Sequence, residues 1–343
     1  MSQVKYYHHG RFRVAGGVLP DAFTAYRTYG DPKNPCIVFP TCYGGRLDNR
    51  GLLGQDYMIA SETEHHALDP AKYYIVTLAL FSNGESSSPS NTAPPYNGPY
   101  FPAVSYGDNI RAQYTVLTKV LGVQKVHCVI GFSMGGQQSY HWAAMYPDYV
   151  EKFIAICGSA RTSPHNKCFL EGPKAALVAS KDFDNGHYKA HPDIGVRAFG
   201  RAYSAWAYGQ TWFRQHGYLH DGKYASLEDF LRAEWEGGFL EWDANDLLTL
   251  LHTWQDGDIT ESVGGSVELA DCLAGLKPRG LIMPCKTDLY FPPEDSENEV
   301  ALMKNGSRLV VIDSVWGHMA GGGSNDKDTR FLDEQIAKFL AEA

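Results

Sequence analysis

The sequence predicts an α/β fold in which a mostly parallel sheet is flanked by helices. The first observation behind this prediction is that short apolar runs alternate along the chain with segments of helical character. The second is the composition, 44% hydrophobic and 20% charged, which is ordinary for a folded chain with a sizeable core. A length of 343 residues allows one large domain or two smaller ones.

The strands and helices can be assigned in chain order. Residues 36–39 predict a buried strand and residues 73–81 the next one, because both runs are short and apolar. Residues 108–121 predict a helix, which Asp108 can cap and Gly122 can end in a left-handed conformation. Further strands are expected over residues 126–132, 153–157, 280–285 and 308–313, and further helices over residues 134–146 and 326–340.

Between residues 162 and 265 the alternation of strands and helices stops. This stretch is irregular and helical in character, and it holds five of the seven tryptophans. These side chains can pack a helical subdomain, and some of them can also line a pocket beside the sheet. We therefore expect a core formed by residues 1–161 and 266–343, with a helical insertion over residues 162–265. The five tryptophans are Trp206, Trp212, Trp235, Trp242 and Trp254.

Charge, hydropathy and cysteine usage argue against several classes of protein. Lys plus Arg number 30 and Asp plus Glu number 39, so the net charge is −9, and nucleic acid is not an expected partner. The longest apolar run, residues 73–81, is far shorter than the roughly 20 residues that span a bilayer, and the first residues lack the apolar part of a secretory signal. The seven cysteines include no Cys-x-x-Cys pair. We expect a cytoplasmic protein with free thiols and no membrane contact.

Residues 131–136, which read GFSMGG, lie between a predicted strand and a predicted helix. A serine at such a strand-to-helix turn needs flanking glycines, because side chains there would collide with the neighbouring strand and helix. The turn exposes the hydroxyl above the helix N-terminus, where free N–H groups favour a developing negative charge. Ser133 is therefore the predicted nucleophile.

A nucleophilic serine needs a base, and the base needs an acid that orients it. Asp288 lies just past the strand predicted over residues 280–285, and His318 lies past the next strand. Parallel strands would bring both to the sheet edge where Ser133 lies. We predict His318 as the base and Asp288 as its partner, with Asp313 as the rival acid. Activity should then fall as His318 becomes protonated, because only the neutral imidazole can act as a base.

The negative charge of an acyl-transfer intermediate needs two backbone donors. One is the amide of Met134, directly after the nucleophile. The second is expected from the loop after the strand at residues 36–39, where Cys42 is the first choice and Tyr43 the second. The arrangement requires no metal, and no H-E-x-x-H motif, phosphate-binding loop or dinucleotide-binding glycine motif occurs. No cofactor is therefore expected.

These residues resemble the homoserine O-acetyltransferase family of α/β-hydrolase-fold enzymes over nearly the whole chain. The most specific segments are SMGGQQ at residues 133–138 and DLYFPP at residues 288–293. The resemblance implies an α/β-hydrolase fold, the triad Ser133, Asp288 and His318, a helical lid over residues 162–265, and a homodimer built on that lid.

The substrate-binding positions of the family do not carry over completely. The family has an Asp directly after the catalytic His, where this chain has Met319. The family's lid Arg corresponds to Gly200, and Arg201 stands one residue later, which turns a helical side chain by about 100°. We therefore do not expect homoserine as the substrate. Arg201, Met319 and the lid residue Trp254 are the candidate substrate contacts.

Three functions follow from these residues. The first is a serine hydrolase that forms an acyl-enzyme on Ser133 and cleaves an ester or thioester of a small, fairly apolar molecule. The second is an O-acyltransferase that moves an acetyl group from acetyl-CoA, as a co-substrate, to a small alcohol. The third is a non-catalytic protein that uses the same fold to bind a ligand. The missing acid at Met319 and the displaced Arg201 favour hydrolysis over transfer.

Overall fold

The computed structural model describes residues 3–47, 53–54, 56–61 and 66–342 of the chain. Ten strands occur in this part of the chain, eight of them in one sheet with the order β1-β2-β6-β3-β7-β8-β9-β10. The first two strands of the sheet pair in an antiparallel manner, and β2 pairs antiparallel with β6, whereas all later pairs are parallel. The strands are β1 (Lys5–Val14), β2 (Gly17–Tyr29), β3 (Cys36–Pro40), β4 (Gly45–Arg46), β5 (Leu53–Gly54), β6 (Tyr74–Leu78), β7 (Val126–Phe132), β8 (Val150–Ile156), β9 (Arg279–Met283) and β10 (Arg308–Leu309).

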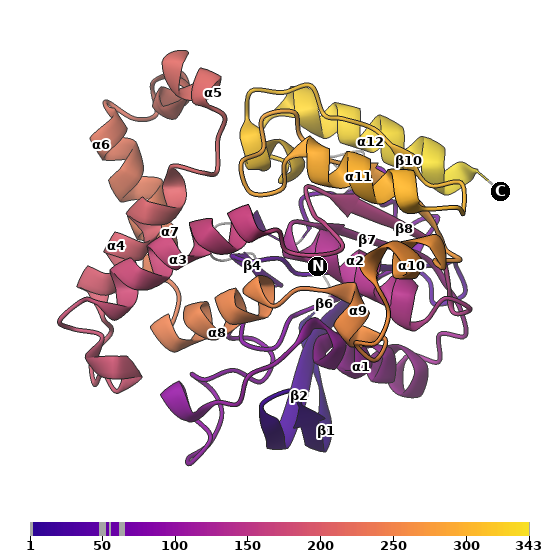
Figure 1. Ribbon diagram of the computed structural model, residues 1–343, viewed down its shortest axis with the longest axis horizontal. Coiled ribbons are helices and arrows are strands. Elements are labelled where there is room, and N and C mark those ends of the chain that lie inside the picture. The colour runs from indigo at the N-terminus through magenta and orange to yellow at the C-terminus, as the bar shows by residue number, and fades with distance from the viewer. Residues whose placement is uncertain (1–2, 48–52, 55, 62–65, 343) are drawn as a thin grey trace.

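Helices cover both faces of this sheet. Residues of α1, α2, α10 and α11 pack with strand residues on one face, and residues of α12 pack on the other. In Figure 1, α12 and α2 lie on opposite sides of the strands. The helices are α1 (Tyr106–Thr115), α2 (Met134–Met145), α3 (Pro164–Val178), α4 (Asp193–Ser204), α5 (Gln210–Arg214), α6 (Leu227–Phe230), α7 (Gly237–Leu240), α8 (Ala244–Gln255), α9 (Ile259–Ser262), α10 (Leu269–Ala274), α11 (Pro293–Leu302) and α12 (Asp326–Ala341).

The α/β prediction is confirmed, and several of its elements differ from the expected ones. The antiparallel hairpin of β1 and β2 was not expected, and it forms one edge of the sheet. Helix α1 begins after Ser105, whose hydroxyl accepts from the N–H of Asp108, so Asp108 completes a capping box rather than standing at the cap. Strand β10 is confined to Arg308–Leu309, which is shorter than the expected strand over residues 308–313.

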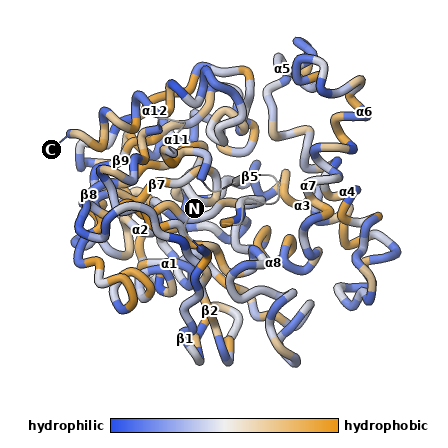
Figure 2. The backbone as a smooth tube through the Cα atoms, turned by 180° about the vertical axis from the view of Figure 1, so that it is seen from behind, coloured by the Kyte–Doolittle hydropathy of each residue, from blue (hydrophilic) through white to orange (hydrophobic). Residues whose placement is uncertain are grey.

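The central strands are buried because helices cover both of their faces, which explains why they read as continuous apolar runs. Every residue of β3 and β6 is buried, and in β7 only His127 is partly exposed. Figure 2 shows hydrophobic stretches along β7 and β8. The largest apolar cluster runs without a break from strand residues such as Ile130 to Phe199 and Phe239 in the segment after β8.

The segment between β8 and β9 contains α3 to α10 and contributes no strand to the sheet. Helices α3 to α8 lie together to one side of the sheet in Figure 1. Several of these helices begin at a polar cap: Ser163 caps α3, Ser226 caps α6 and Asp243 caps α8. The hydroxyl of Tyr43, in the loop after β3, donates to the carbonyl oxygen of Leu247 in α8 at 3.1 Å.

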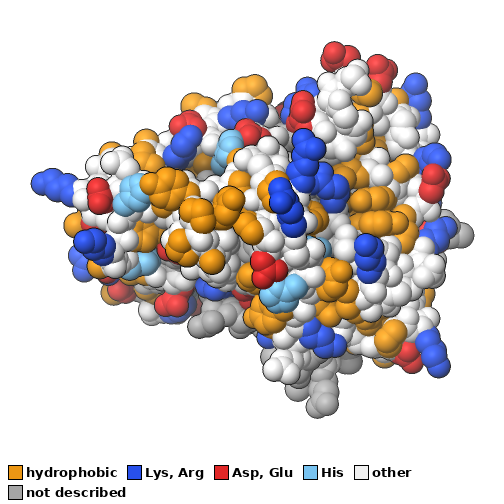
Figure 3. All heavy atoms as spheres, turned by 90° about the horizontal axis from the view of Figure 1, so that it is seen from below, with side chains coloured by type: hydrophobic (Ala, Val, Ile, Leu, Met, Phe, Trp, Pro, Cys, Tyr) orange, Lys and Arg blue, Asp and Glu red, His pale blue; other side chains and the backbone are white. Residues whose placement is uncertain are grey.

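Acidic and basic side chains are mixed on the face of the molecule that is seen from below in Figure 3. Both kinds occur across the face seen in Figure 3, with hydrophobic side chains among them. None of the helices in the described ranges is both long enough and apolar enough to cross a membrane.

Candidate active site

Ser133 stands at the sharp turn between β7 and α2. Its backbone has φ 57° and ψ −123°, a conformation that residues other than glycine rarely adopt and that is concentrated at functional sites. The Ser133 N–H donates to the carbonyl oxygen of Ile156 at 2.9 Å, which ties the turn to the end of β8. The residue is 2% exposed, and its position at the N-terminus of α2 places it beside backbone N–H groups with no acceptor within the helix.

Glycines around Ser133 allow this turn because the backbone segments approach closely. A Cβ atom on Gly131 would lie 2.1 Å from the backbone of Gly135. A Cβ atom on Gly158 would lie 2.9 Å from the carbonyl oxygen of Ser133. Both distances are shorter than any real contact of a Cβ atom, so these glycines are required by space.

Asp288 and His318 form a buried hydrogen-bonded pair. The Nδ1 atom of His318 lies 2.8 Å from Oδ2 of Asp288, and the two residues are 4% and 3% exposed. The other carboxylate oxygen, Oδ1, accepts from the N–H groups of Tyr290 at 2.8 Å and Phe291 at 3.1 Å. Because a carboxylate can only accept, His318 donates through Nδ1, which leaves the lone pair on Nε2 free to take a proton.

Aromatic rings fix the orientation of the His318 imidazole. The ring centroids of Phe132 and Tyr290 lie 4.6 Å and 4.7 Å from that of His318. His318 belongs to the short helical turn Gly317–Gly321, and Gly317 has φ 59°. A Cβ atom on Gly317 would lie 2.7 Å from the N atom of Gly209, so this turn can approach the segment before α5 only with glycine there.

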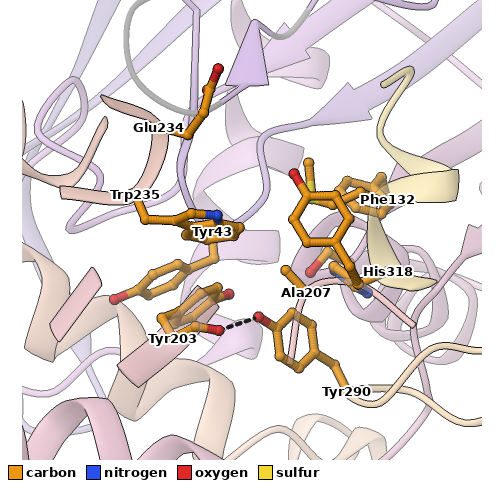
Figure 4. Close-up of a pocket in the computed structure, with 11 residues that line it drawn as sticks. Tyr43, Phe132, Tyr203, Ala207, Glu234, Trp235, Tyr290 and His318 are labelled. Carbon is orange, nitrogen blue, oxygen red and sulfur yellow. Dashed lines mark hydrogen bonds between the residues drawn. The ribbon is translucent and has the colours of Figure 1, made fainter. Parts of the chain in front are cut away.

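A cavity of about 60 Å³ joins Ser133 and His318. Figure 4 shows its two sides, with Tyr43, Tyr203 and Trp235 on one and Phe132 and His318 on the other, and with Ala207 between them. The hydroxyl of Tyr290 donates to the carbonyl oxygen of Tyr203 at 3.0 Å. The cavity is lined by Tyr43, Phe132, Ser133, Tyr203, Ala207, Tyr208, Glu234, Trp235, Tyr290, His318 and Met319.

The residues expected to supply the oxyanion donors lie around the same turn. Met134 is the first residue of α2 and is fully buried. Tyr43 lines the cavity, whereas Cys42 is buried behind it and is not one of the lining residues. Burial raises the pKa of the Cys42 thiol to about 12, so this thiol stays neutral.

The three candidate substrate contacts lie in different places. Met319 lines the cavity next to His318. The guanidinium of Arg201 is held by Glu228, at 2.7 Å, and by Glu236, and it is not among the cavity residues. Trp254 is fully buried and packs behind the lining, with its ring centroid 5.7 Å from that of Tyr43.

The rival acid Asp313 lies on the surface. Its side chain is 84% exposed and pairs with Lys286 at 3.0 Å. Because the hydrogen bond of His318 goes to Asp288, the structure pairs the base with Asp288 and not with Asp313.

The sequence analysis does not assign Cys157 to this site, nor most of the aromatic residues that line the cavity. A thiol sulfur, a carboxylate oxygen and an imidazole nitrogen from Cys157, Asp288 and His318 lie within 4.8 Å of one another. Three such groups could hold a metal ion, but a thiol ligates a metal as thiolate. Burial, followed by the charge of Asp288, raises the pKa of Cys157 well above its ordinary value and keeps the thiol neutral.

Comparison with known proteins places the chain among hydrolases. The alpha/beta hydrolase fold family model matches residues 42–184. The chain is 33% identical to a probable esterase of Corynebacterium glutamicum, with 89% of this chain and 86% of the relative covered. It is 32% identical to an ethyl acetate hydrolase of Pseudomonas veronii, with 95% and 92% covered.

The chain is also similar to solved structures and to acetyltransferases. An acetylester hydrolase from Corynebacterium glutamicum superposes with a TM-score of 0.91 at 30% identity, with 99% of this chain and 96% of that chain covered. Homoserine O-acetyltransferases are also relatives, among them that of Methanosalsum zhilinae, which is 30% identical over 93% of this chain and 69% of its own length. The chain therefore belongs to the alpha/beta hydrolase family, among relatives that include both esterases and homoserine O-acetyltransferases.

Proposed function

We propose that the protein is a serine esterase that cleaves esters of small, uncharged molecules through an acyl-enzyme on Ser133. The observation that carries this proposal is the buried hydrogen bond from His318 Nδ1 to Asp288, with His318 and Ser133 on one cavity. The relatives named as an esterase and as an ethyl acetate hydrolase, each more than 30% identical, support it.

In the first half-reaction, the Oγ atom of Ser133 attacks the ester carbonyl carbon while Nε2 of His318 takes the hydroxyl proton. Asp288 holds the imidazole in the tautomer that leaves Nε2 free and stabilises the imidazolium that forms. Collapse of the tetrahedral intermediate breaks the bond to the alcohol oxygen, which leaves with the proton from His318. The acyl group is then bonded to Ser133.

In the second half-reaction, water replaces the alcohol. His318 takes a proton from the water as its oxygen attacks the acyl carbon, and the same proton returns to Ser133 as the acid leaves. The negative oxygen of both intermediates is bound by backbone N–H groups, for which we propose Met134 with Cys42 or Tyr43. The N-terminus of α2 adds the favourable end of the helix dipole.

The cavity favours a short acyl group. Its volume of about 60 Å³ gives room for roughly four water-sized groups. Its wall consists mainly of aromatic rings such as Tyr43 and Tyr203, whose centroids lie 5.7 Å apart in a stacked arrangement. An acetyl ester of a small alcohol suits this volume and this apolar lining.

Hydrolysis is favoured over transfer from acetyl-CoA by the charges at the site. Among the described residues that line the cavity there is no Lys or Arg, and the one carboxylate is Glu234, which pairs with Lys223 at 2.6 Å. A coenzyme with several phosphates and an amino acid with a free carboxylate both need cationic partners. Arg201 cannot act as this partner from its present place, because Glu228 and Glu236 hold its guanidinium.

The test uses a fluorophosphonate probe and acetate ester hydrolysis with the wild-type chain, Ser133→Ala and the control Ser266→Ala, which alters an exposed serine. We expect labelling and turnover in the wild type and the control and neither in Ser133→Ala. Full turnover by Ser133→Ala would contradict every enzymatic proposal, and an unlabelled Ser133 would favour a binding protein. Thiol release from acetyl-CoA that depends on an added alcohol and yields its acetyl ester would favour the acyltransferase.

We also propose, from the family resemblance, that the helices between β8 and β9 act as a lid and that the protein is a homodimer through them. Val178 and Ile194, which are 44% and 66% exposed, place apolar surface on this segment. Light scattering after size-exclusion chromatography tests the dimer, and a mass of 38.0 kDa would contradict it.

A further inference from the structure

The end of β8 connects the two halves of the proposed catalytic machinery. The carbonyl oxygen of Ile156 accepts from the N–H of Ser133 at 2.9 Å. The next residue, Cys157, donates its N–H to the carbonyl oxygen of Met283 at 3.0 Å, at the end of the strand that leads to Asp288. The following residue, Gly158, packs directly against the backbone of Ser133. Three successive residues therefore contact the turn of the nucleophile on one side and the strand before the acid on the other.

Cys157 has an unusual backbone and a fully buried side chain. Its φ is 46°, in the left-handed region that β-carbon-bearing residues avoid, and its exposed fraction is 0%. Residues keep such a conformation only where the surrounding structure imposes it. Here the hydrogen bonds of the neighbouring strands impose it, and the result is that the side chain lies beside Asp288 and His318.

The thiol of Cys157 is a neutral donor next to a carboxylate. Its sulfur lies within 4.8 Å of the ligand atoms of both Asp288 and His318. A buried thiol that cannot ionise has one proton to donate, and a carboxylate is a better acceptor than an uncharged group. The competing acceptor is the carbonyl oxygen of Met283, which lies 3.9 Å from the sulfur, at the limit for such a bond.

We propose that Cys157 is a positioning residue for the Asp288–His318 pair, whose thiol donates to the Asp288 carboxylate and helps to hold it toward the imidazole. This inference rests on the proposed esterase function. The carboxylate then has donors from three directions: the amides of Tyr290 and Phe291 on one oxygen, the imidazole on the other, and the thiol of Cys157. Cys157 does not touch the substrate, and it acts through Asp288.

The titratable groups that face Cys157 are few. Besides burial, the charges of Asp288 and Cys285 both raise the pKa of the Cys157 thiol, and Tyr57 lies near enough for Cys157 to raise the pKa of its hydroxyl. Burial raises the pKa of Cys285 to about 11 and that of Tyr57 well above its ordinary value, so both stay neutral between pH 5 and 9. A change at Cys157 is therefore reported by the Asp288–His318 pair alone in this range.

The experiment compares Cys157→Ala, which removes the donor, with Cys157→Ser, which keeps one. Both variants retain a Cβ atom, so the backbone strain at φ 46° is the same in all three proteins. Cys128→Ala is the matched control, because Cys128 is also fully buried but its sulfur lies near the carbonyl oxygen of Val129. Activity is measured as kcat and KM for an acetate ester from pH 5 to 9, with thermal unfolding of each variant.

We expect Cys157→Ala to lower kcat roughly fivefold with KM unchanged, which is the size of one modest hydrogen bond. Its acid limb should move to lower pH, because a carboxylate that is held less firmly against the imidazole stabilises the imidazolium less. Cys157→Ser should restore both quantities, and Cys128→Ala should change neither. Wild-type kinetics in Cys157→Ala, or an equal loss in the Ala and Ser variants, would overturn the proposal and leave the sulfur a packing role.

A second readout does not need turnover. The proton shared by His318 Nδ1 and Asp288 gives a downfield NMR resonance. Cys157→Ala should move this resonance upfield, because the hydrogen bond to the less firmly held carboxylate weakens, and Cys157→Ser should return it. If Ser133→Ala abolishes activity but this resonance is identical in all Cys157 variants, the inference about Cys157 fails and the esterase proposal stands. If no ester is cleaved by the wild type, the esterase proposal fails, and the resonance still decides whether the thiol contacts Asp288.

Discussion

Replacing Asp288 by Asn tests the core of the proposed mechanism while leaving the shape of the site unchanged. The Asn side chain can keep its oxygen at the Oδ1 position, where it accepts from Tyr290 and Phe291 at 2.8 Å and 3.1 Å in the wild type. Its NH2 group then replaces Oδ2 and faces Nδ1 of His318, which lies 2.8 Å away.

This geometry determines the size of the effect. A donor at the Oδ2 position requires Nδ1 of His318 to accept, so the ring proton moves to Nε2, and Nε2 can no longer take the proton of Ser133. Only the minor tautomer remains active, and the imidazolium loses the carboxylate that stabilises it. We expect kcat to fall by about 10⁴, the loss seen when a triad carboxylate becomes an amide. Stability should change by no more than about 1 kcal/mol, because the backbone donors keep their acceptor.

The assay is acetate ester hydrolysis at pH 8, with urea unfolding as a check on the fold. Asp313→Asn is the matched control, because the same chemical change then occurs at an exposed surface pair with Lys286. Asp313→Asn should retain wild-type activity. A folded Asp288→Asn variant with more than a tenth of wild-type kcat, or an inactive Asp313→Asn, would refute the assignment of the acid.

Three further predictions concern stability and selectivity. Burial raises the pKa of Glu299 to about 8, and Asp295 and Tyr140 are the titratable groups that face it. Because this folded pKa lies above the unfolded value, the contribution of Glu299 to the free energy of unfolding is fully present below about pH 4.5 and is lost as the pH rises through 8. Urea midpoints between pH 5 and 9 should therefore fall less in Glu299→Gln than in the wild type, and parallel curves would contradict this. Gly131→Ala should abolish folding or fluorophosphonate labelling, because its Cβ atom would lie 2.1 Å from the backbone of Gly135. The control Gly172→Ala, in open space on α3, should stabilise the protein by about 0.5–1 kcal/mol in the same urea assay. Ala207→Leu should fill the cavity between its two walls and lower kcat/KM for acetate esters by about tenfold or more, and an unchanged value would place the acyl group elsewhere.

The parts of the protein that could be predicted from sequence are those with a strong local cause. The turn at Ser133 is recognisable because its glycines must follow a strand and precede a helix, and the parallel strands are recognisable because burial on both faces makes them continuously apolar. The hairpin of β1 and β2 gives no such signal, because its residues form no continuous apolar run: β1 includes several polar side chains, and Val14 is its one buried residue.

The role inferred for Cys157 has no local signal. A cysteine at the end of an apolar run is an ordinary core residue, and only the register of β8 with β9 brings it beside Asp288. The ion pairs of Arg201 also have no local signal, because its partners Glu228 and Glu236 lie 27 and 35 residues further along the chain. Long-range contacts of this kind are set by the packing of whole elements and not by the residues next to them in sequence.

Tyr43 links the wall of the cavity to helix α8. Its loop follows β3, its ring forms part of the cavity wall, and its hydroxyl is bonded to Leu247 in α8. A displacement of α8 would therefore also displace the loop after β3, which is proposed to supply an oxyanion donor. If the helices between β8 and β9 open as the proposed lid, the oxyanion-binding site would be disrupted in the same movement. Substitutions that weaken the packing of α8 should then reduce turnover before they unfold the sheet. The oxyanion donors would be in place for an ester only while the helices are closed over the cavity.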